Sequence, residues 1–492
     1  MTKIEHRSGV VRQAFDRRRV VASIVSIEMW ERFSFYGMQA LLAYYLYFEA
    51  NLGGLGMDQQ QATALVGAYG ATLYLCCWAG GWVSDRLLGA EMTLLTGAIS
   101  VSIGHISLAL IGGYPGLCIG LTLIALGSGF LKTSAITVLG SSAEPTTDTS
   151  KPDPAFQYFY LGINVGALLG PLLTGWLSTR YNFEIGFGTA AILMAIGLGI
   201  YLTLRPAMLK TLPTDLLQMF LAPQQPVTPR TALLWIGGVI VIAGSVAALL
   251  FSGKISAGNL ANGILLLTAL AALWLFILPL QHHEVSAAEK KKVLGFIPIF
   301  ICSTAFWTLQ GQTYGVLAVY SQERVNRMLG SFEVPAAWSQ SLNPFYILAF
   351  SIPLSVALSK LGNHGLTLRR SISLGVIISG SGMLVLIPFT GTTSVPLWVL
   401  PLSILLISLG ELLIGPGGMA AVAHHAPRAF ATRFSALYFL TLAIGMSLAG
   451  TMSEFYDPST PAAEIQYFAL IGGATIAIGA ITLPLSLRNS DK

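Results

Sequence analysis

Residues 20–48 read VVASIVSIEMWERFSFYGMQALLAYYLYF, an apolar run long enough to cross a lipid bilayer as a helix. Near its middle the run contains three ionisable residues, Glu28, Glu31 and Arg32. A charged side chain at the centre of a membrane helix costs about 2.5–3.5 kcal/mol, so the three together cost roughly 8–10 kcal/mol. Because residues three and four apart share one face of a helix, we expect all three to face a protein interior or a watery cavity.

The composition of the 492-residue chain indicates the same environment. Apolar residues make up 54% of it and charged residues 10%, whereas soluble domains carry about 25% charged residues. Such a chain cannot cover the surface of a soluble protein, and it is too apolar to stay disordered. Its net charge of +5 is small and dispersed, so we expect no nucleic-acid partner. The four cysteines lie in apolar runs without CxxC spacing, so we expect no metal site.

Fourteen apolar runs are long enough to be transmembrane helices. Six precede a polar stretch at 205–230, two follow it, and six more follow a charged stretch at 281–292. The predicted spans are 20–48, 62–83, 92–111, 115–140, 155–178, 184–204, 231–252, 259–280, 293–319, 337–358, 369–389, 397–421, 430–451 and 464–487.

The order of the spans predicts an all-α polytopic membrane protein with the major-facilitator fold, in which substrate binds between two six-helix bundles. We predict an N-terminal bundle at 1–204, a linker with two inserted helices at 205–292, and a C-terminal bundle at 293–492. Fourteen equivalent helices are an alternative that hydropathy does not exclude.

Basic residues in the loops predict the orientation of the chain. Of the 27 Lys and Arg residues, 21 fall on the side of the N-terminus and two, Arg32 and Lys132, fall within spans. The remaining four fall on the other side: Arg180, Lys254, Arg324 and Arg327. We therefore predict a plasma (inner) membrane protein with both termini in the cytoplasm. We expect the basic first residues not to act as a signal peptide, because no cleavage-like site follows them.

Charged residues inside the predicted spans indicate a proton and substrate site. Two carboxylates beside an arginine repel one another unless one is protonated, so we expect at least one of Glu28 and Glu31 to have a pKa that can shift. Arg32 and Lys132 supply positive charge for a substrate carboxylate, and Glu411 supplies negative charge for an ammonium group. Charges of both signs suit a zwitterion. The alternative interpretation is an ion-pair network that only fixes helix packing.

The sequence resembles bacterial members of the proton-dependent oligopeptide transporter family over nearly its whole length. The first-helix signature ExxERFxYY is present at Glu28–Tyr36, with Phe35 where the first tyrosine is usual. The other matching motifs are GGWVSDR at 80–86, FLK at 130–132, FYLGINVG at 159–166, SLNP at 341–344, and GE at 410–411 followed by Pro416. Bacterial members of the family also carry an extra helix pair between the two halves.

The resemblance implies a proton-coupled symporter that imports di- and tripeptides by alternating access, with Glu28, Glu31, Arg32 and Lys132 in proton coupling. Asp85 and Arg86 could be catalytic in isolation, but their position in a loop between two spans favours a conformational latch. The substrate-binding residues that the resemblance implies are Arg32, Tyr36, Tyr74, Lys132, Asn164, Trp307, Gln310, Asn343, Glu411 and Tyr438.

One departure concerns the seventh helix of the two bundles. Many relatives carry an acidic residue on that helix, where this chain has Gln310. They also often carry an arginine about two turns beyond Arg32 on the first helix, where this chain has Gln39. Proton coupling therefore cannot use a carboxylate on the seventh helix, and the proton stoichiometry stays open.

Other functions are less compatible with the sequence. No GxSxG, Walker A, HExxH or GxGxxG motif occurs in a suitable context, so we expect neither an enzyme nor a cofactor. A receptor would need a sizeable sensory loop, and none exceeds 205–230. The alternative that stays open is a carrier of the same fold for nitrate or a peptide-like drug. We expect a monomer whose partners are peptide, protons and membrane lipid.

Overall fold

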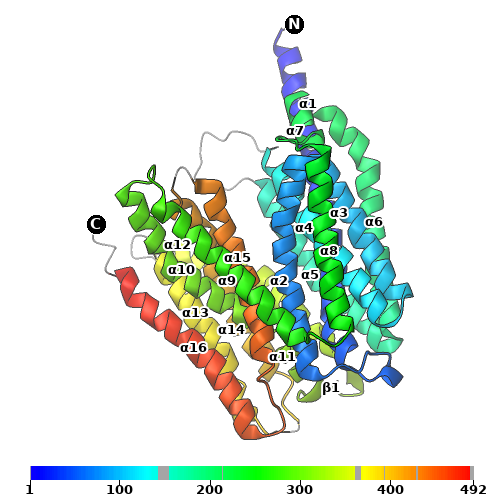
Figure 1. Cartoon of the computed structure of the whole chain (residues 1–492), viewed down its shortest axis with the longest axis vertical. Coiled ribbons are helices and arrows are strands. Elements are labelled where there is room, and N and C mark those ends of the chain that lie inside the picture. Colours follow the sequence, from blue (N-terminus) through cyan, green and yellow to red (C-terminus); the bar gives the residue numbers. More distant parts are fainter. Residues whose placement is uncertain are drawn as a thin grey trace. The chain divides into compact units, whose positions relative to one another are not determined.

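The computed structural model describes residues 2–141, 154–212, 214–360, 367–392, 394–427 and 430–487. These residues are almost entirely helical, apart from a short hairpin of β1 (Met328–Leu329) and β2 (Phe332–Glu333) (Figure 1). The helices are α1 (Thr2–Tyr47), α2 (Gln59–Val83), α3 (Ala90–Leu110), α4 (Gly113–Ser141), α5 (Pro154–Arg180), α6 (Phe183–Thr211), α7 (Thr214–Leu221), α8 (Pro229–Phe251), α9 (Ala257–Gln281), α10 (Ala287–Gly311), α11 (Val316–Glu323), α12 (Leu342–Lys360), α13 (Leu368–Leu384), α14 (Val399–His425), α15 (Ala431–Ser453) and α16 (Pro461–Leu487).

Among the described residues, eleven helical segments are long and apolar enough to cross a membrane. The chain is therefore a multi-pass membrane protein, as its composition predicts. The predicted count of fourteen is not confirmed. The other three predicted spans correspond to α1, which carries the central charges, to α8, and to α14, whose apolar part is shorter (Val399–Gly415).

The chain divides into two compact units, and α1 and α2 each contribute to both of them. One unit contains Met1–Gln39 and Leu75–Lys254, and the other contains Ala40–Tyr74 and Ile255–Lys492. The inserted pair is also divided, since α8 belongs to the first unit and α9 to the second. The three-part division at residues 204 and 292 stays a prediction.

In the first unit, glycines on α5 allow its backbone to approach that of α1 closely. A Cβ atom added at Gly166 would lie 2.4 Å from the carbonyl oxygen of Met29, and one at Gly170 would lie 2.4 Å from the carbonyl oxygen of Phe33. One turn further, Thr174 Oγ1 donates a hydrogen bond of 2.9 Å to the Gly37 carbonyl oxygen. Small residues at helix interfaces are the usual means of close packing in membranes. This stripe holds the charged centre of α1 against α5.

In the second unit, the helix predicted at 293–319 is broken. α10 ends at Gly311 and α11 begins at Val316, with successive turn hydrogen bonds from Gln312 to Gly315 between them. Tyr467 of α16 donates to Gln312 Oε1 at 2.8 Å, and Gln312 Nε2 donates to the Ala449 carbonyl oxygen at 3.2 Å. Hydrophobicity alone does not reveal this break, because the turn residues are as buried as the helices on either side.

The α1–α5 contact leads to a stability prediction. We expect Gly166→Ala to lower the free energy of unfolding by about 1–3 kcal/mol, because its Cβ would overlap the α1 backbone. Gly199→Ala on α6 is the matched control, since a Cβ there meets nothing within 4 Å. Apparent melting temperatures in detergent test this. Equal melting temperatures for the two variants would show that the glycine stripe does not fix α1.

Candidate functional site

In the first unit, the three charged residues of α1 form one buried cluster. Glu28 and Glu31 are 0% exposed and Arg32 is 2% exposed. Arg32 Nε donates a hydrogen bond of 2.5 Å to Glu31 Oε2 and lies 3.3 Å from Glu28 Oε1. The arginine thus pairs with both carboxylates, with Glu28 at the i,i+4 spacing that favours such a pair and with its chain neighbour Glu31.

The two carboxylates have different surroundings. Glu31 also accepts a hydrogen bond of 2.5 Å at Oε1 from the hydroxyl of Ser128 on α4. Glu28 has no hydrogen-bond partner at either oxygen among the described residues, although it lies within ion-pair distance of Arg32. A carboxylate that accepts several hydrogen bonds is stabilised in its charged form. Glu31 therefore receives a hydrogen bond at each oxygen, whereas Glu28 receives none from the described residues.

The guanidinium group of Arg32 can form a further hydrogen bond. Its guanidinium carbon lies 5.1 Å from the centre of the Phe35 ring and 5.9 Å from that of Tyr36. Its Nη2 atom is buried and has no hydrogen-bond partner in the described part of the chain. Lys132 of α4 interacts electrostatically with Arg32 and with both glutamates. Two cations and two acids thus share this cluster, and a guanidinium N–H group is left for a carboxylate oxygen.

Three other predicted residues of this unit, Asn164, Asp85 and Arg86, form hydrogen bonds that involve backbone groups. Asn164 is buried, and its Nδ2 donates to the carbonyl oxygen of Tyr160, one turn back on α5, at 2.9 Å. Between α2 and α3, the carbonyl oxygen of Asp85 accepts from the backbone N–H of Gln225 at 2.9 Å, and that of Arg86 accepts from Val227 at 3.2 Å. The segment after α7 therefore binds the turn that contains the predicted latch.

In the second unit, Glu411 of α14 is paired with an amide. Asn343 Nδ2 donates to Glu411 Oε2 at 2.8 Å and lies 3.0 Å from Ser408 Oγ. Among the described residues, no lysine or arginine forms an ion pair with Glu411. This carboxylate is therefore held by a neutral amide, with no basic ion-pair partner in the described part of the chain.

Aromatic residues of the second unit share one apolar cluster. Tyr438 is buried in it, and Tyr74 and Trp307 are partly buried against it. The indole Nε1 of Trp307 has no hydrogen-bond partner among the described residues. Gln310, one turn after Trp307, is 3% exposed, and its Oε1 is also without a partner in the described part of the chain. Unsatisfied polar atoms of this kind are uncommon in protein interiors.

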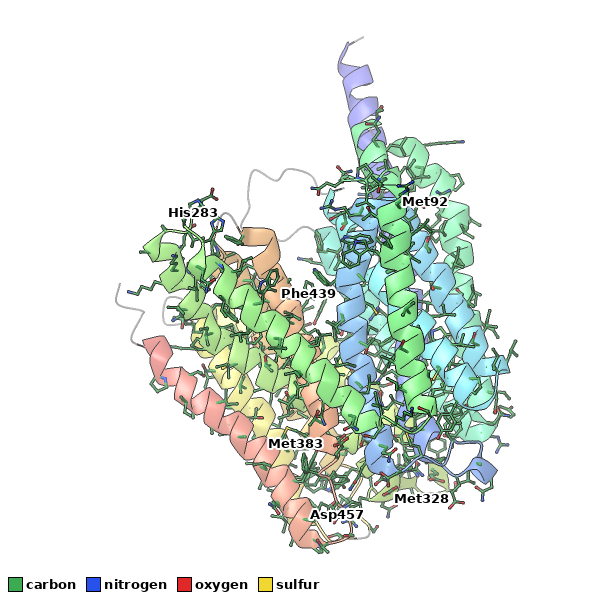
Figure 2. The ribbon with its side chains drawn as sticks, in the orientation of Figure 1. Met92, His283, Met328, Met383, Phe439 and Asp457 are labelled. Carbon is green, nitrogen blue, oxygen red and sulfur yellow. The ribbon has the colours of Figure 1, made fainter. Side chains whose placement is uncertain are left out.

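Two ion pairs, each between a buried glutamate and a partly exposed arginine, were not predicted from the sequence. Glu91, at the start of α3 beside Met92 (labelled in Figure 2), accepts hydrogen bonds of 2.5 and 2.9 Å from Arg205 of α6. Glu464 of α16 accepts 2.6 Å from Arg324 and 2.9 Å from Tyr456. Arg205 and Arg324 lie in predicted loops, where basic residues are usually solvated. The acidic residues in the first turns of α3 and α16 were the available signal.

Ser128 was also missed. It lies four residues before Lys132, so both side chains lie on the same face of α4. A single serine in an apolar helix is not distinctive, because such hydroxyls usually bond to their own helix.

Buried acids and bases that are paired inside a multi-pass helical protein are typical of secondary transporters. The first unit supplies an acid–base cluster and the second an amide-bound carboxylate. This combination defines a membrane carrier.

The chain belongs to the POT family, whose profile matches residues 91–468. It is 33% identical to the "Uncharacterized transporter YclF" of Bacillus subtilis (strain 168), over 96% of this chain and 94% of that protein. It is 31% identical to a "Di-/tripeptide transporter" of Lactococcus lactis subsp. cremoris, over 95% of each protein.

Solved structures of the same family have the same fold. A crystal structure of peptide transporter POT in complex with sulfate matches with a TM-score of 0.88 at 33% identity, over 96% of this chain and 94% of that chain. A POT family transporter in complex with 5-aminolevulinic acid matches with a TM-score of 0.87 at 30% identity, over 96% of both chains.

The buried α1 cluster leads to a second stability prediction. We expect Arg32→Met to lower the free energy of unfolding by about 3–5 kcal/mol, because it leaves buried carboxylates without their counter-charge. Adding Glu31→Gln to the same chain should recover at least about 1 kcal/mol, since the unpaired carboxylate becomes neutral. Apparent melting temperatures of the single and double variants in detergent measure the coupling. Strictly additive losses would contradict it.

Proposed function

We propose that this protein is a proton-coupled symporter that imports di- and tripeptides by alternating access. The observation that carries the proposal is the α1 cluster, in which Arg32 pairs with two buried carboxylates and keeps one N–H group without a partner. A cluster of this composition offers both a place for a substrate carboxylate and a group that can take a proton. The names of the peptide-transporting relatives support the substrate class.

The proposal assigns the two charged ends of a zwitterionic substrate to residues of opposite charge. Arg32 and Lys132, with Tyr36 beside them, would bind the peptide carboxylate. Glu411, held by Asn343 and without a basic partner among the described residues, would bind the ammonium group. The further candidates for contacts with the peptide are Tyr74, Asn164, Trp307, Gln310 and Tyr438. A family member has been solved with 5-aminolevulinic acid, itself a small molecule with an amine and a carboxylate, which supports this division.

Proton coupling would depend on the unequal positions of the two glutamates. Glu31 accepts hydrogen bonds at both oxygens, whereas Glu28 accepts none from the described residues. We propose that Glu28 takes the proton and that Lys132 responds to the resulting change of charge. One proton moving down about 100 mV supplies roughly 2.3 kcal/mol, and one pH unit adds about 1.4 kcal/mol. Together these suffice for a several-hundredfold accumulation of a neutral zwitterion.

The location and the assembly of the protein are part of the same proposal. We propose that it lies in the plasma (inner) membrane as a monomer, with both termini in the cytoplasm, because the basic loop residues favour that side. The turn with Asp85 and Arg86 would act as a latch between conformations. The backbone bonds from Gln225 and Val227 support this, since they tie the segment after α7 to that turn.

Transport of dialanine into proteoliposomes with an imposed pH gradient tests the proposal. We expect the wild type to accumulate labelled dialanine above its external concentration. Glu31→Gln should abolish accumulation driven by the gradient, because the charge that pairs with Arg32 is lost, while counterflow exchange of dialanine persists. Retained counterflow shows that the variant is folded and binds its substrate.

Two outcomes would contradict the proposal. Unchanged gradient-driven uptake by Glu31→Gln would remove Glu31 from proton coupling. Failure of the wild type to carry dialanine, together with uptake of nitrate or of a peptide-like drug in the same vesicles, would favour the alternative substrate class.

The role of Glu411 is tested with a substrate that lacks the ammonium group. We expect Glu411→Gln to weaken dialanine binding about 10- to 100-fold, as the loss of a charge-assisted hydrogen bond requires. Binding of N-acetyl-dialanine should change little, because that peptide has no cation for Glu411 to bind. Competition assays with wild type and variant measure both affinities. Equal weakening for the two peptides would assign Glu411 a purely structural role.

A further inference from the structure

Ser128 forms a hydrogen bond that links α4 to the charged centre of α1. Its side chain is fully buried, and its hydroxyl donates to Glu31 Oε1 at 2.5 Å. Arg32 Nε donates to the other oxygen, Oε2, also at 2.5 Å. Glu31 is therefore held at both oxygens by donors from two different helices.

Ser128 departs from the usual behaviour of hydroxyl groups in membrane helices. Most of them bond to a carbonyl one turn back in their own helix. On α4, Thr133 donates to the Gly129 carbonyl oxygen at 2.9 Å, and Thr137 donates to the Thr133 carbonyl oxygen at 3.0 Å. Ser128 instead donates its hydrogen bond to the carboxylate of Glu31 on another helix.

The two donors define the charge state that this site favours. Both donate to Glu31, and hydrogen bonds to a charged carboxylate are stronger than those to a neutral one, so a proton on Glu31 would weaken both. Glu28 differs, because neither of its oxygens receives a hydrogen bond from the described residues. Hydrogen bonds to the charged form favour that form. The donor on α4 thus distinguishes two glutamates that the sequence places only one turn apart.

We propose that Ser128 is a positioning residue that keeps Glu31 charged and paired with Arg32, and so directs the coupled proton to Glu28. The inference rests on the proposed proton-coupled function. Ser128 and Lys132 lie on one face of α4, so any movement of α4 against α1 displaces the hydroxyl and the ammonium group together. The charge of Glu31 and the position of Lys132 are thereby linked.

Transport measurements on variants of Ser128 test this role. In Ser128→Ala we expect the pH of half-maximal gradient-driven dialanine uptake to rise by about one unit, which corresponds to a tenfold change in proton affinity. Ser128→Thr keeps the hydroxyl and should retain the wild-type pH profile. Ser128→Cys supplies a weaker donor of similar size and should give an intermediate shift. An unchanged pH profile in Ser128→Ala would overturn the inference.

Ser134→Ala is the matched control on the same helix. Ser134 is also fully buried, but its hydroxyl has no hydrogen-bond partner among the described residues. We expect the pH profile of this variant to match that of the wild type. A shift equal to that of Ser128→Ala would show that any buried serine of α4 has this effect, and would also overturn the inference.

A measurement without transport separates this inference from the proposed function. Infrared titration follows the carboxyl band of Glu31 in Glu28→Gln and in Glu28→Gln/Ser128→Ala, with the band identified by its loss in Glu31→Gln. We expect the band to titrate about one pH unit higher without the hydroxyl. Equal titration would overturn the role of Ser128 even if dialanine is transported. A clear shift would support it even if the wild type carries another solute.

Discussion

This structure depends on keeping three charged residues of one apolar helix away from lipid. They are Glu28, Glu31 and Arg32, and burying them in a membrane costs free energy. Three unpaired charges there would cost roughly 8–10 kcal/mol. Pairing of Arg32 with both acids and the hydrogen bond from Ser128 offset this cost only while neighbouring helices exclude lipid from the cluster. The close approach of α5 at Gly166 and Gly170 is therefore part of the functional arrangement as well as of the fold.

The second unit is organised around another kind of polar group. Glu411 is bound by the Asn343 amide, and no basic residue forms an ion pair with it in the described part of the chain. The two polar groups therefore differ in chemistry. The group on α1 combines acids with bases, whereas Glu411 has no basic ion-pair partner in the described part of the chain. Ion pairs at helix ends, such as Arg324 with Glu464, instead hold helices together within a unit.

The sequence predicted the membrane class and the α1 cluster because both rest on simple rules. Apolar length defines spans, and residues three or four apart share a helix face. The same rules could not predict the turn between α10 and α11, because its residues are buried like those of a helix. Nor could they predict that Glu91 and Glu464 pair with Arg205 and Arg324, since those partners are separated by more than a hundred residues.

The non-equivalence of Glu28 and Glu31 has the same origin. Both are glutamates in the sequence, and the difference arises from their hydrogen bonds in the fold, where Ser128 of α4 and Arg32 donate to Glu31 and not to Glu28. Residues that act through tertiary contacts of this kind can be identified only from the structure. Charged residues within membrane helices can be identified from the sequence.

We propose that the buried acids of α1 carry protons together with a zwitterionic solute. The most direct measurement is proton entry into proteoliposomes that contain a trapped pH indicator, after dialanine is added outside with no gradient imposed. The account predicts that dialanine acidifies the lumen in the wild type and that Glu28→Gln exchanges dialanine without acidification. Dialanine entry into wild-type vesicles with no accompanying acidification would contradict it.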